Sequence, residues 1–139
     1  TAEARKAQER MGRQRLSLTA GLSRHPRLLM LAEAAEQRRW MANWPCVWGA
    51  ETACLGIDLN PSLTAYGYQS VNGILAASAK LIRIGPTDIQ GIMYRTRDAM
   101  MAAIEASAPV TENDIGCFTP ALDIAGSRHE TAYTRLFIS

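Results

Sequence analysis

The chain has few of the residues and motifs on which most enzyme chemistry depends. It holds two histidines, His25 and His129, among 139 residues. It contains no glycine-rich phosphate loop of the Walker type and no G-x-S-x-G nucleophile motif. His25 stands directly before Pro26, where a capping role at a helix break is expected rather than catalysis. The sequence therefore predicts a protein with no catalytic residues and no bound cofactor.

Long apolar runs are also absent. No run approaches the roughly 20 residues that a membrane-spanning helix needs, and no secretory signal opens the sequence. A content of 47% hydrophobic and 20% charged residues excludes a disordered chain. Three cysteines, an odd number, favour reduced thiols and a cytoplasmic protein with no membrane partner.

The chain has no metal-ligand spacing among its cysteines and histidines, although Cys46, Cys54, Cys117, His25 and His129 are all possible soft or borderline ligands. Cys46 and Cys54 are eight residues apart, about two helical turns, which is too far to share one ion. Their apolar neighbours are typical of cysteines that act as small hydrophobic residues. We predict no metal site, and a protein that binds a metal ion directly stays the alternative.

Positive charge is unevenly distributed along a chain of net charge +2. Residues 1–40 carry nine Lys/Arg against four Asp/Glu, a balance of +5, and the remainder carries six against nine, a balance of −3. Such asymmetry can steer an acidic partner. The basic residues alternate with Glu and Gln and lack interleaved aromatics, so no nucleic-acid partner is predicted. A basic helical nucleic-acid binder stays a rival reading, which would show steeply salt-dependent binding to arbitrary duplexes.

Helical periodicity dominates, and no stretch alternates convincingly at period two. We predict a single all-α domain over residues 1–139, a bundle of about five to seven helices joined by short connections. Proline, glycine and capping residues predict helices over about 2–22, 27–40, 43–56, 60–84 and 87–105, and one short turn at 111–114.

The two longest internal helices carry predicted buried faces. The 60–84 helix is expected to be central and closely packed on more than one side, because it is rich in small residues, and to bury Leu63, Tyr66, Ile74, Ala77 and Leu81. Thr87 and Gln90 match a capping box that opens the next helix. The apolar stripe of that helix is Ile89, Ile92, Met93, Thr96, Met100, Ala103 and Ile104.

Three tryptophans, Trp40, Trp44 and Trp48, recur every four residues. On one continuous helix they would form an aromatic ridge suited to a partner. Pro45 interrupts that helix, so we predict a corner between helices that is packed by the tryptophans.

The C-terminal tail, residues 126–139, differs from the usual short polar terminus. It bears two arginines, a histidine and a tyrosine and ends near Leu136-Phe137-Ile138. Tyr, Phe and Arg are enriched where binding energy concentrates. We predict partial helix over 122–138, interrupted at Gly126, and a partner-binding role for the tail. The structural alternative is a terminal helix docked on the protein's own core.

Three segments carry a resemblance to a known family. Residues 128–139, RHETAYTRLFIS, are similar to the RHET-x-Y-[ST]-RLF-x-S signature of urease accessory proteins of the F type (UreF). Residues 118–125 resemble the family's F-x-P-x-LDIAS segment, and residues 80–90 resemble its RLIPLGQTDGQ turn. Arg83, Pro86 and Ile89 depart from that turn, where the family has proline, glutamine and glycine. The family's glycine-rich N-terminal portion is absent, so the chain resembles the C-terminal two-thirds of such a protein.

The resemblance implies a non-catalytic adaptor for nickel insertion. Such a protein assembles with UreD (also called UreH) and the GTPase UreG, matures the nickel centre of apo-urease and forms a homodimer. The alternative is a metallochaperone that binds nickel itself. The residues that carry over as partner-facing candidates are Arg128, His129, Glu130, Tyr133, Arg135, Leu136 and Phe137.

Overall fold

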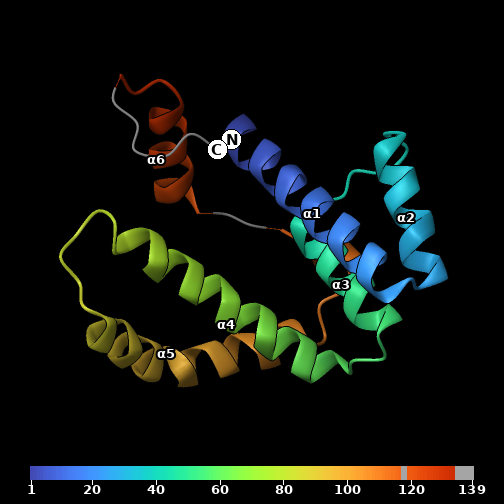
Figure 1. Ribbon diagram of the computed structural model, residues 1–139. Coiled ribbons are helices and arrows are strands. Elements are labelled where there is room, and N and C mark those ends of the chain that lie inside the picture. The colour runs from blue at the N-terminus through green and yellow to red at the C-terminus, as the bar shows by residue number, and fades with distance from the viewer. Residues whose placement is uncertain (117–118, 134–139) are drawn as a thin grey trace. The chain divides into compact units, whose positions relative to one another are not determined.

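The computed structural model describes residues 1–116 and 119–133, and this part of the chain is helical without any β-strand (Figure 1). The prediction of an all-α protein with five to seven helices is confirmed. None of the described helices combines the length and the apolar character needed to cross a membrane. The elements are α1 (Ala2–Ser23), α2 (Pro26–Glu36), α3 (Trp44–Cys54), α4 (Leu59–Ser78), α5 (Pro86–Ser107), the 3-10 helix η1 (Glu112–Asp114) and α6 (Pro120–Glu130).

The chain divides into two compact units. Unit 1 comprises residues 1–56 together with the segment from residue 116 onward, and holds α1, α2, α3 and α6. Unit 2 comprises residues 57–115 and holds α4, α5 and η1. A single domain over 1–139 stays a prediction.

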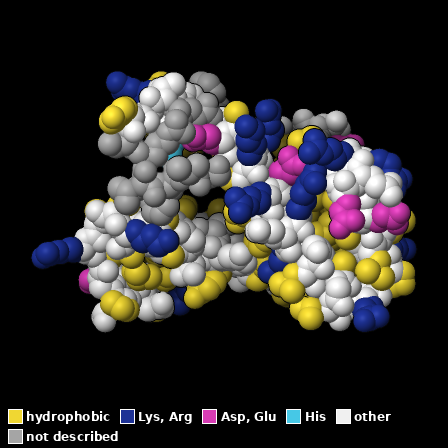
Figure 2. Space-filling view, turned by 45° about the horizontal axis from the view of Figure 1, so that its top comes forward, with side chains coloured by type: hydrophobic (Ala, Val, Ile, Leu, Met, Phe, Trp, Pro, Cys, Tyr) yellow, Lys and Arg dark blue, Asp and Glu magenta, His cyan; other side chains and the backbone are white. Residues whose placement is uncertain are grey.

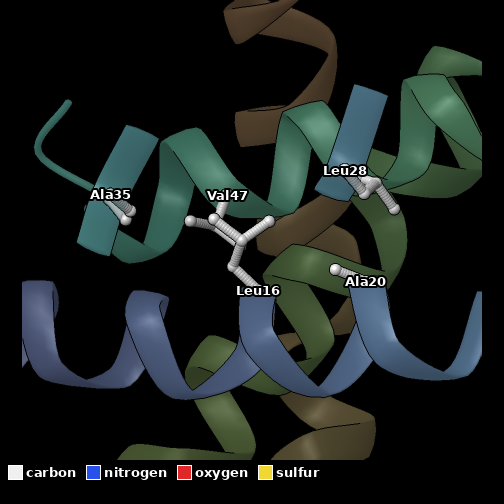
Figure 3. Close-up of a cluster of buried hydrophobic side chains, with 6 residues drawn as sticks. Leu16, Ala20, Leu28, Ala35 and Val47 are labelled. Atoms are coloured by element: carbon white, nitrogen blue, oxygen red, sulfur yellow. The ribbon is translucent and has the colours of Figure 1, made fainter. Parts of the chain in front are cut away.

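The core of unit 1 lies where α1 packs on α2 and α3. The Thr1 side chain caps α1 by accepting a hydrogen bond from the Ala4 amide at 3.2 Å. Figure 3 shows Leu16 of α1 pointing toward Val47 of α3, with side chains of α2 beside them. The buried residues of this cluster are Leu16, Ala20, Leu28, Ala35, Ala42 and Val47. Burial of these apolar side chains is the main favourable term that holds the three helices together.

Helix α1 approaches the segment before α3 very closely at Gly12, which is buried. A Cβ atom at position 12 would overlap the carbonyl oxygen of Ala42, and backbone atoms cannot move aside cheaply. Glycine is therefore required here by the contact itself.

A buried ion pair joins α1 to α3 on a face lined by tryptophans. The Arg15 Nε donates to Glu51 Oε2 at 2.8 Å, and Glu51 is only 1% exposed. The Arg15 guanidinium lies 5.7 Å from the ring centroid of Trp44 and 5.4 Å from that of Trp48. The two rings are 5.9 Å apart, and Trp40 packs against the apolar cluster. The tryptophans thus serve packing within unit 1, as predicted for a helix corner.

Unit 2 is a pair of packed helices, α4 and α5. The predicted stripe of α5 is confirmed in its main part, because Met93 and Ile104 are buried and Ile89, Ile92, Thr96 and Met100 are half-buried, although Ala103 is exposed. The predicted capping box at Thr87 is wrong. The helix begins two residues earlier, with Gly85 as its N-cap, and the Gly85 amide donates to the Asp88 carboxylate at 3.2 Å.

The predicted end of α4 and the predicted buried residues of its second half are wrong. The helix ends at Ser78 rather than near residue 84, and Ile74, Ala77 and Leu81 are exposed while Leu75 is buried. Leu63 and Tyr66, in the first half, are half-buried as expected. The reason is that α5 is the helix that packs on α4 within this unit, so one face of α4 is covered rather than several.

Two further boundaries differ from prediction. Helix α2 ends at Glu36 rather than Trp40, because Arg38 adopts a left-handed backbone with φ of 54°. Gly126 does not interrupt α6, which runs through it from Pro120 to Glu130. A single glycine costs a helix about 1 kcal/mol relative to alanine, which the surrounding turns can offset.

Candidate partner-binding site

Helix α6 positions the described part of the C-terminal tail. Pro120 occupies the first turn, where its missing N–H costs no hydrogen bond, and Asp123 lies near the positive N-terminal end of the helix dipole. Arg128 and His129 lie in the last turn, where cationic side chains are favoured. The chain leaves the helix at Thr131, whose hydroxyl donates to the Arg128 carbonyl at 3.2 Å.

One side of α6 meets the start of α1. The His129 Nδ1 lies 3.3 Å from Glu3 Oε2, an interaction between side chains that are 43% and 23% exposed. A Cβ atom at Gly126 would come 3.0 Å from the Thr1 methyl group. His129 therefore has a role inside unit 1, as an anchor of the helix, besides its predicted role toward a partner.

The rest of α6 is open to solvent. The described side chains of this helix are exposed apart from the half-buried Gly126 and His129. Leu122 is 72% exposed and Ile124 61%. Arg128 is exposed, and Tyr133, just beyond the helix, projects fully into solvent. A helix that presents Leu, Ile and Arg without burying them, followed by an exposed Tyr, is typical of a surface that another protein covers.

The remaining predicted residues are only partly within the described structure. Glu130 ends α6, with its backbone described. Arg135, Leu136 and Phe137 lie outside the described residues, as does Cys117. The structure thus brings Arg128, His129 and Tyr133 to one end of α6, and the partner role of the whole set stays a prediction.

Possible metal ligands are dispersed within the part of the chain that is described. No group of three His, Cys, Asp or Glu side chains there is arranged to hold an ion. Cys46 is exposed and Cys54 half-buried. His25 is the N-cap residue of α2, with its backbone extended, but its side chain makes no capping hydrogen bond. Nothing in this arrangement favours the metal-carrying alternative.

Sequence reasoning missed the Arg15–Glu51 pair. A usable signal was present, since Glu51 is the only charged residue of α3 and is surrounded by Ala, Cys, Val and Trp. A lone acidic residue in an apolar helix indicates a buried carboxylate that needs a partner.

The fold and this surface define a class: a helical protein whose last described helix is exposed and whose described residues form no metal cluster. The family model for UreF matches residues 1–97, and the chain belongs to the UreF family. The predicted family is thereby confirmed, and of the three segments that carry the resemblance, residues 80–90 lie within the match.

Several curated relatives carry the name urease accessory protein UreF. The chain is 36% identical over 96 residues to the protein of Bradyrhizobium diazoefficiens. The aligned residues make up 69% of this chain and 40% of the relative. It is 28% identical over 137 residues to that of Haemophilus influenzae, covering 99% of this chain and 58% of the relative. The protein of Actinobacillus pleuropneumoniae is 27% identical over 137 residues, with 60% of its length covered. The chain therefore spans three fifths or less of these relatives, which are named as accessory proteins rather than enzymes.

Proposed function

We propose that this chain acts in urease maturation as a non-catalytic adaptor. Its membership of the UreF family supports this role, as does the name, urease accessory protein UreF, of relatives that align over 99% of the chain. In this proposal the chain works in the cytoplasm, assembles with UreD (UreH) and the GTPase UreG, and serves nickel insertion into apo-urease. It forms a homodimer in that assembly.

The C-terminal tail is the proposed contact with a partner. The observation that carries this proposal is the exposure of α6, where Leu122, Ile124 and Arg128 lie in solvent, together with the fully exposed Tyr133. Burial of exposed apolar side chains by a partner is favourable, and Arg128 can form two parallel hydrogen bonds to a carboxylate. His129 and Glu130, at the end of α6, belong to the proposed set, and Arg135, Leu136 and Phe137 complete it.

Affinity purification tests the proposal directly. The tagged chain is co-expressed with UreD, UreG and urease subunits, with and without residues 128–139. We expect UreD and UreG to be recovered with the intact chain and lost from the shortened one, while both chains retain the same helical circular dichroism. Recovery of both partners by the shortened chain would remove the tail from the proposal. Failure of the intact chain to recover either partner would end the adaptor function itself.

A further inference from the structure

A groove lined mainly by basic side chains lies in unit 1, apart from the residues assigned to the partner site. It has a volume of about 450 Å³ and is bounded by α1 and by the turn that follows α2. Figure 2 shows several Lys and Arg side chains on the molecular surface, with Asp or Glu side chains beside some of them. The residues that line this groove are Lys6, Glu9, Arg10, Arg13, Gln14 and Arg38.

The groove has a strong excess of positive charge. Four of its lining side chains are cationic and one, Glu9, is anionic. Glu9 Oε1 accepts from Arg13 Nη2 at 2.6 Å, which fixes that guanidinium along α1. The Nε of Arg13 is buried and has no hydrogen-bond partner among the described residues. A buried N–H has no exposed surface for a ligand to reach, so Arg13 contributes to the groove through its positive charge.

Arg38 has a left-handed backbone conformation that glycine would adopt more readily. Its φ is 54°, and its amide donates to the Ala35 carbonyl at 3.2 Å as the chain leaves α2. A left-handed conformation costs a residue with a Cβ atom about 1 kcal/mol relative to glycine. Arg24 has the same conformation outside the groove, so it is the position of the Arg38 side chain in the basic groove that bears on ligand binding.

An apolar groove adjoins the basic one. It has a volume of about 480 Å³, shares Arg13 and Gln14 with the basic groove, and continues over Leu18, Ala32 and Ala35. Leu18 is 60% exposed although it stands at the edge of the core. A ligand that crosses from one groove to the other would meet cations first and aliphatic side chains next.

We infer that these adjoining grooves bind an acidic peptide segment of a partner protein, with carboxylates on Arg10, Arg13 and Arg38 and an apolar side chain beside Leu18. Arginine clusters recognise acidic motifs in this way, and opposite charge both speeds association and selects the partner. The inference does not rest on the proposed urease role.

A protein ligand fits better than a nucleic acid. Glu9 lines the basic groove and Glu36 the apolar one, so a continuous phosphate backbone would meet a carboxylate in each, whereas a peptide can place its carboxylates on the arginines and uncharged side chains beside Glu9 and Glu36. The grooves also lack the aromatic side chains on which bases stack.

Fluorescence anisotropy with a defined probe tests the inference on the full chain. The probe is a labelled peptide of glutamates with two leucines, and the matched probe carries glutamine in place of each glutamate. We expect the glutamate peptide to bind, its affinity to fall as sodium chloride is raised, and the glutamine peptide to bind at least about tenfold more weakly.

Two substitutions that each remove one positive charge distinguish binding in the groove from an effect of the chain's net charge. Arg38→Gly should weaken peptide binding roughly tenfold while the thermal midpoint stays level or rises, because glycine suits the left-handed backbone. Arg24→Gly is the matched control: Arg24 also has a left-handed backbone, with φ of 50°, and lies outside both grooves. It should leave binding within about twofold. Arg10→Gln, on the exposed face of α1, should weaken binding as Arg38→Gly does.

Three results would overturn the inference. The first is no measurable binding of the glutamate peptide at low salt. The second is an equal loss of affinity in the Arg24→Gly and Arg38→Gly variants, which would assign binding to net charge alone. The third is tighter binding of a duplex DNA probe that is weakened by Arg38→Gly, which would make the groove a phosphate site. None of these results depends on the recovery of UreD or UreG.

Discussion

Unit 1 contains two regions that differ in whether their apolar side chains are buried. In the bundle of α1, α2 and α3, Leu16, Leu28 and Val47 are at most 1% exposed, and the one buried carboxylate is paired. In α6 no described side chain is buried, and the apolar Leu122 and Ile124 face water. Both regions are helical with apolar residues, so helix formation alone does not separate them. The bundle buries its apolar residues, whereas α6 leaves Leu122 and Ile124 exposed, where the proposed partner would cover them.

The largest expected effect concerns the bundle. Leu16→Ala should lower the free energy of unfolding by about 3 kcal/mol, because a fully buried leucine leaves a cavity that neighbouring helices fill only in part. Chemical denaturation followed by circular dichroism measures it. Leu122→Ala in α6 is the matched control and should change stability by less than about 0.5 kcal/mol. A larger loss at Leu122 than at Leu16 would reverse the contrast between the two regions.

The next effect concerns binding. Arg135→Ala or Phe137→Ala should weaken assembly with the proposed partners about thirtyfold, equivalent to about 2 kcal/mol, while the thermal midpoint of the free chain hardly moves. Partner titration and thermal melting of the same variants provide both numbers. A drop of several kcal/mol in the stability of the Phe137→Ala variant, with binding intact, would place Phe137 in a core instead.

The buried ion pair should matter somewhat less than Leu16. Arg15→Met should cost about 2 kcal/mol, because it leaves Glu51 buried without its partner, and the 39% exposure of Arg15 reduces the loss expected for a fully buried pair. Combining Arg15→Met with Glu51→Gln should recover part of the stability. A double variant that is less stable than Arg15→Met alone would show that Glu51 has a role beyond this pair.

The contact between α6 and α1 should contribute little. His129→Ala removes a half-exposed pair with Glu3, and such pairs are worth at most about 1 kcal/mol. Amide hydrogen exchange of residues 120–130 should quicken while the core amides of α1 stay unchanged. Slower exchange in α6 of this variant would contradict the anchoring role.

The smallest effect belongs to a turn outside both regions. The Thr111 hydroxyl donates to Asp114 at 2.6 Å, and this hydrogen bond, with that from the Thr111 amide, lowers the pKa of the Asp114 carboxyl. A carboxyl whose folded pKa is lowered adds stability above its unfolded pKa and loses it as the pH falls through the folded value. Thr111→Val should raise the Asp114 pKa, measured by NMR titration. An unchanged pKa would show that the backbone amide alone sets it.

The sequence was most informative where a helix has one apolar stripe. The spacing of Ile89, Met93 and Ile104 identified the buried face of α5, because charged residues occupy the opposite side. Helix α4 is apolar or small nearly all round, so its sequence could not identify which face is covered, and Ile74 was assigned wrongly. Helix ends were predicted well at prolines and less well at Arg38, where no glycine marks the left-handed residue.

The part of the candidate site that depends on local composition could also be predicted from the sequence. The composition of residues 128–137 indicated recognition without any knowledge of packing. The contact between His129 and Glu3 joins residues 126 positions apart, and no local pattern reports such a pair. The basic groove likewise combines α1 with Arg38 through the path of α2, which only the three-dimensional fold reveals.

Gly12 has a consequence for the direction in which α1 presents its charges. Because only a residue without a side chain fits against the Ala42 carbonyl, α1 cannot turn about its own axis without driving Met11 or Arg13 into that oxygen. The rotation of the helix about its own axis is therefore fixed at one point near its middle. Lys6, Arg10 and Arg13 follow one another at helical spacing, so a single glycine on the inner side orients a row of cations on the outer side.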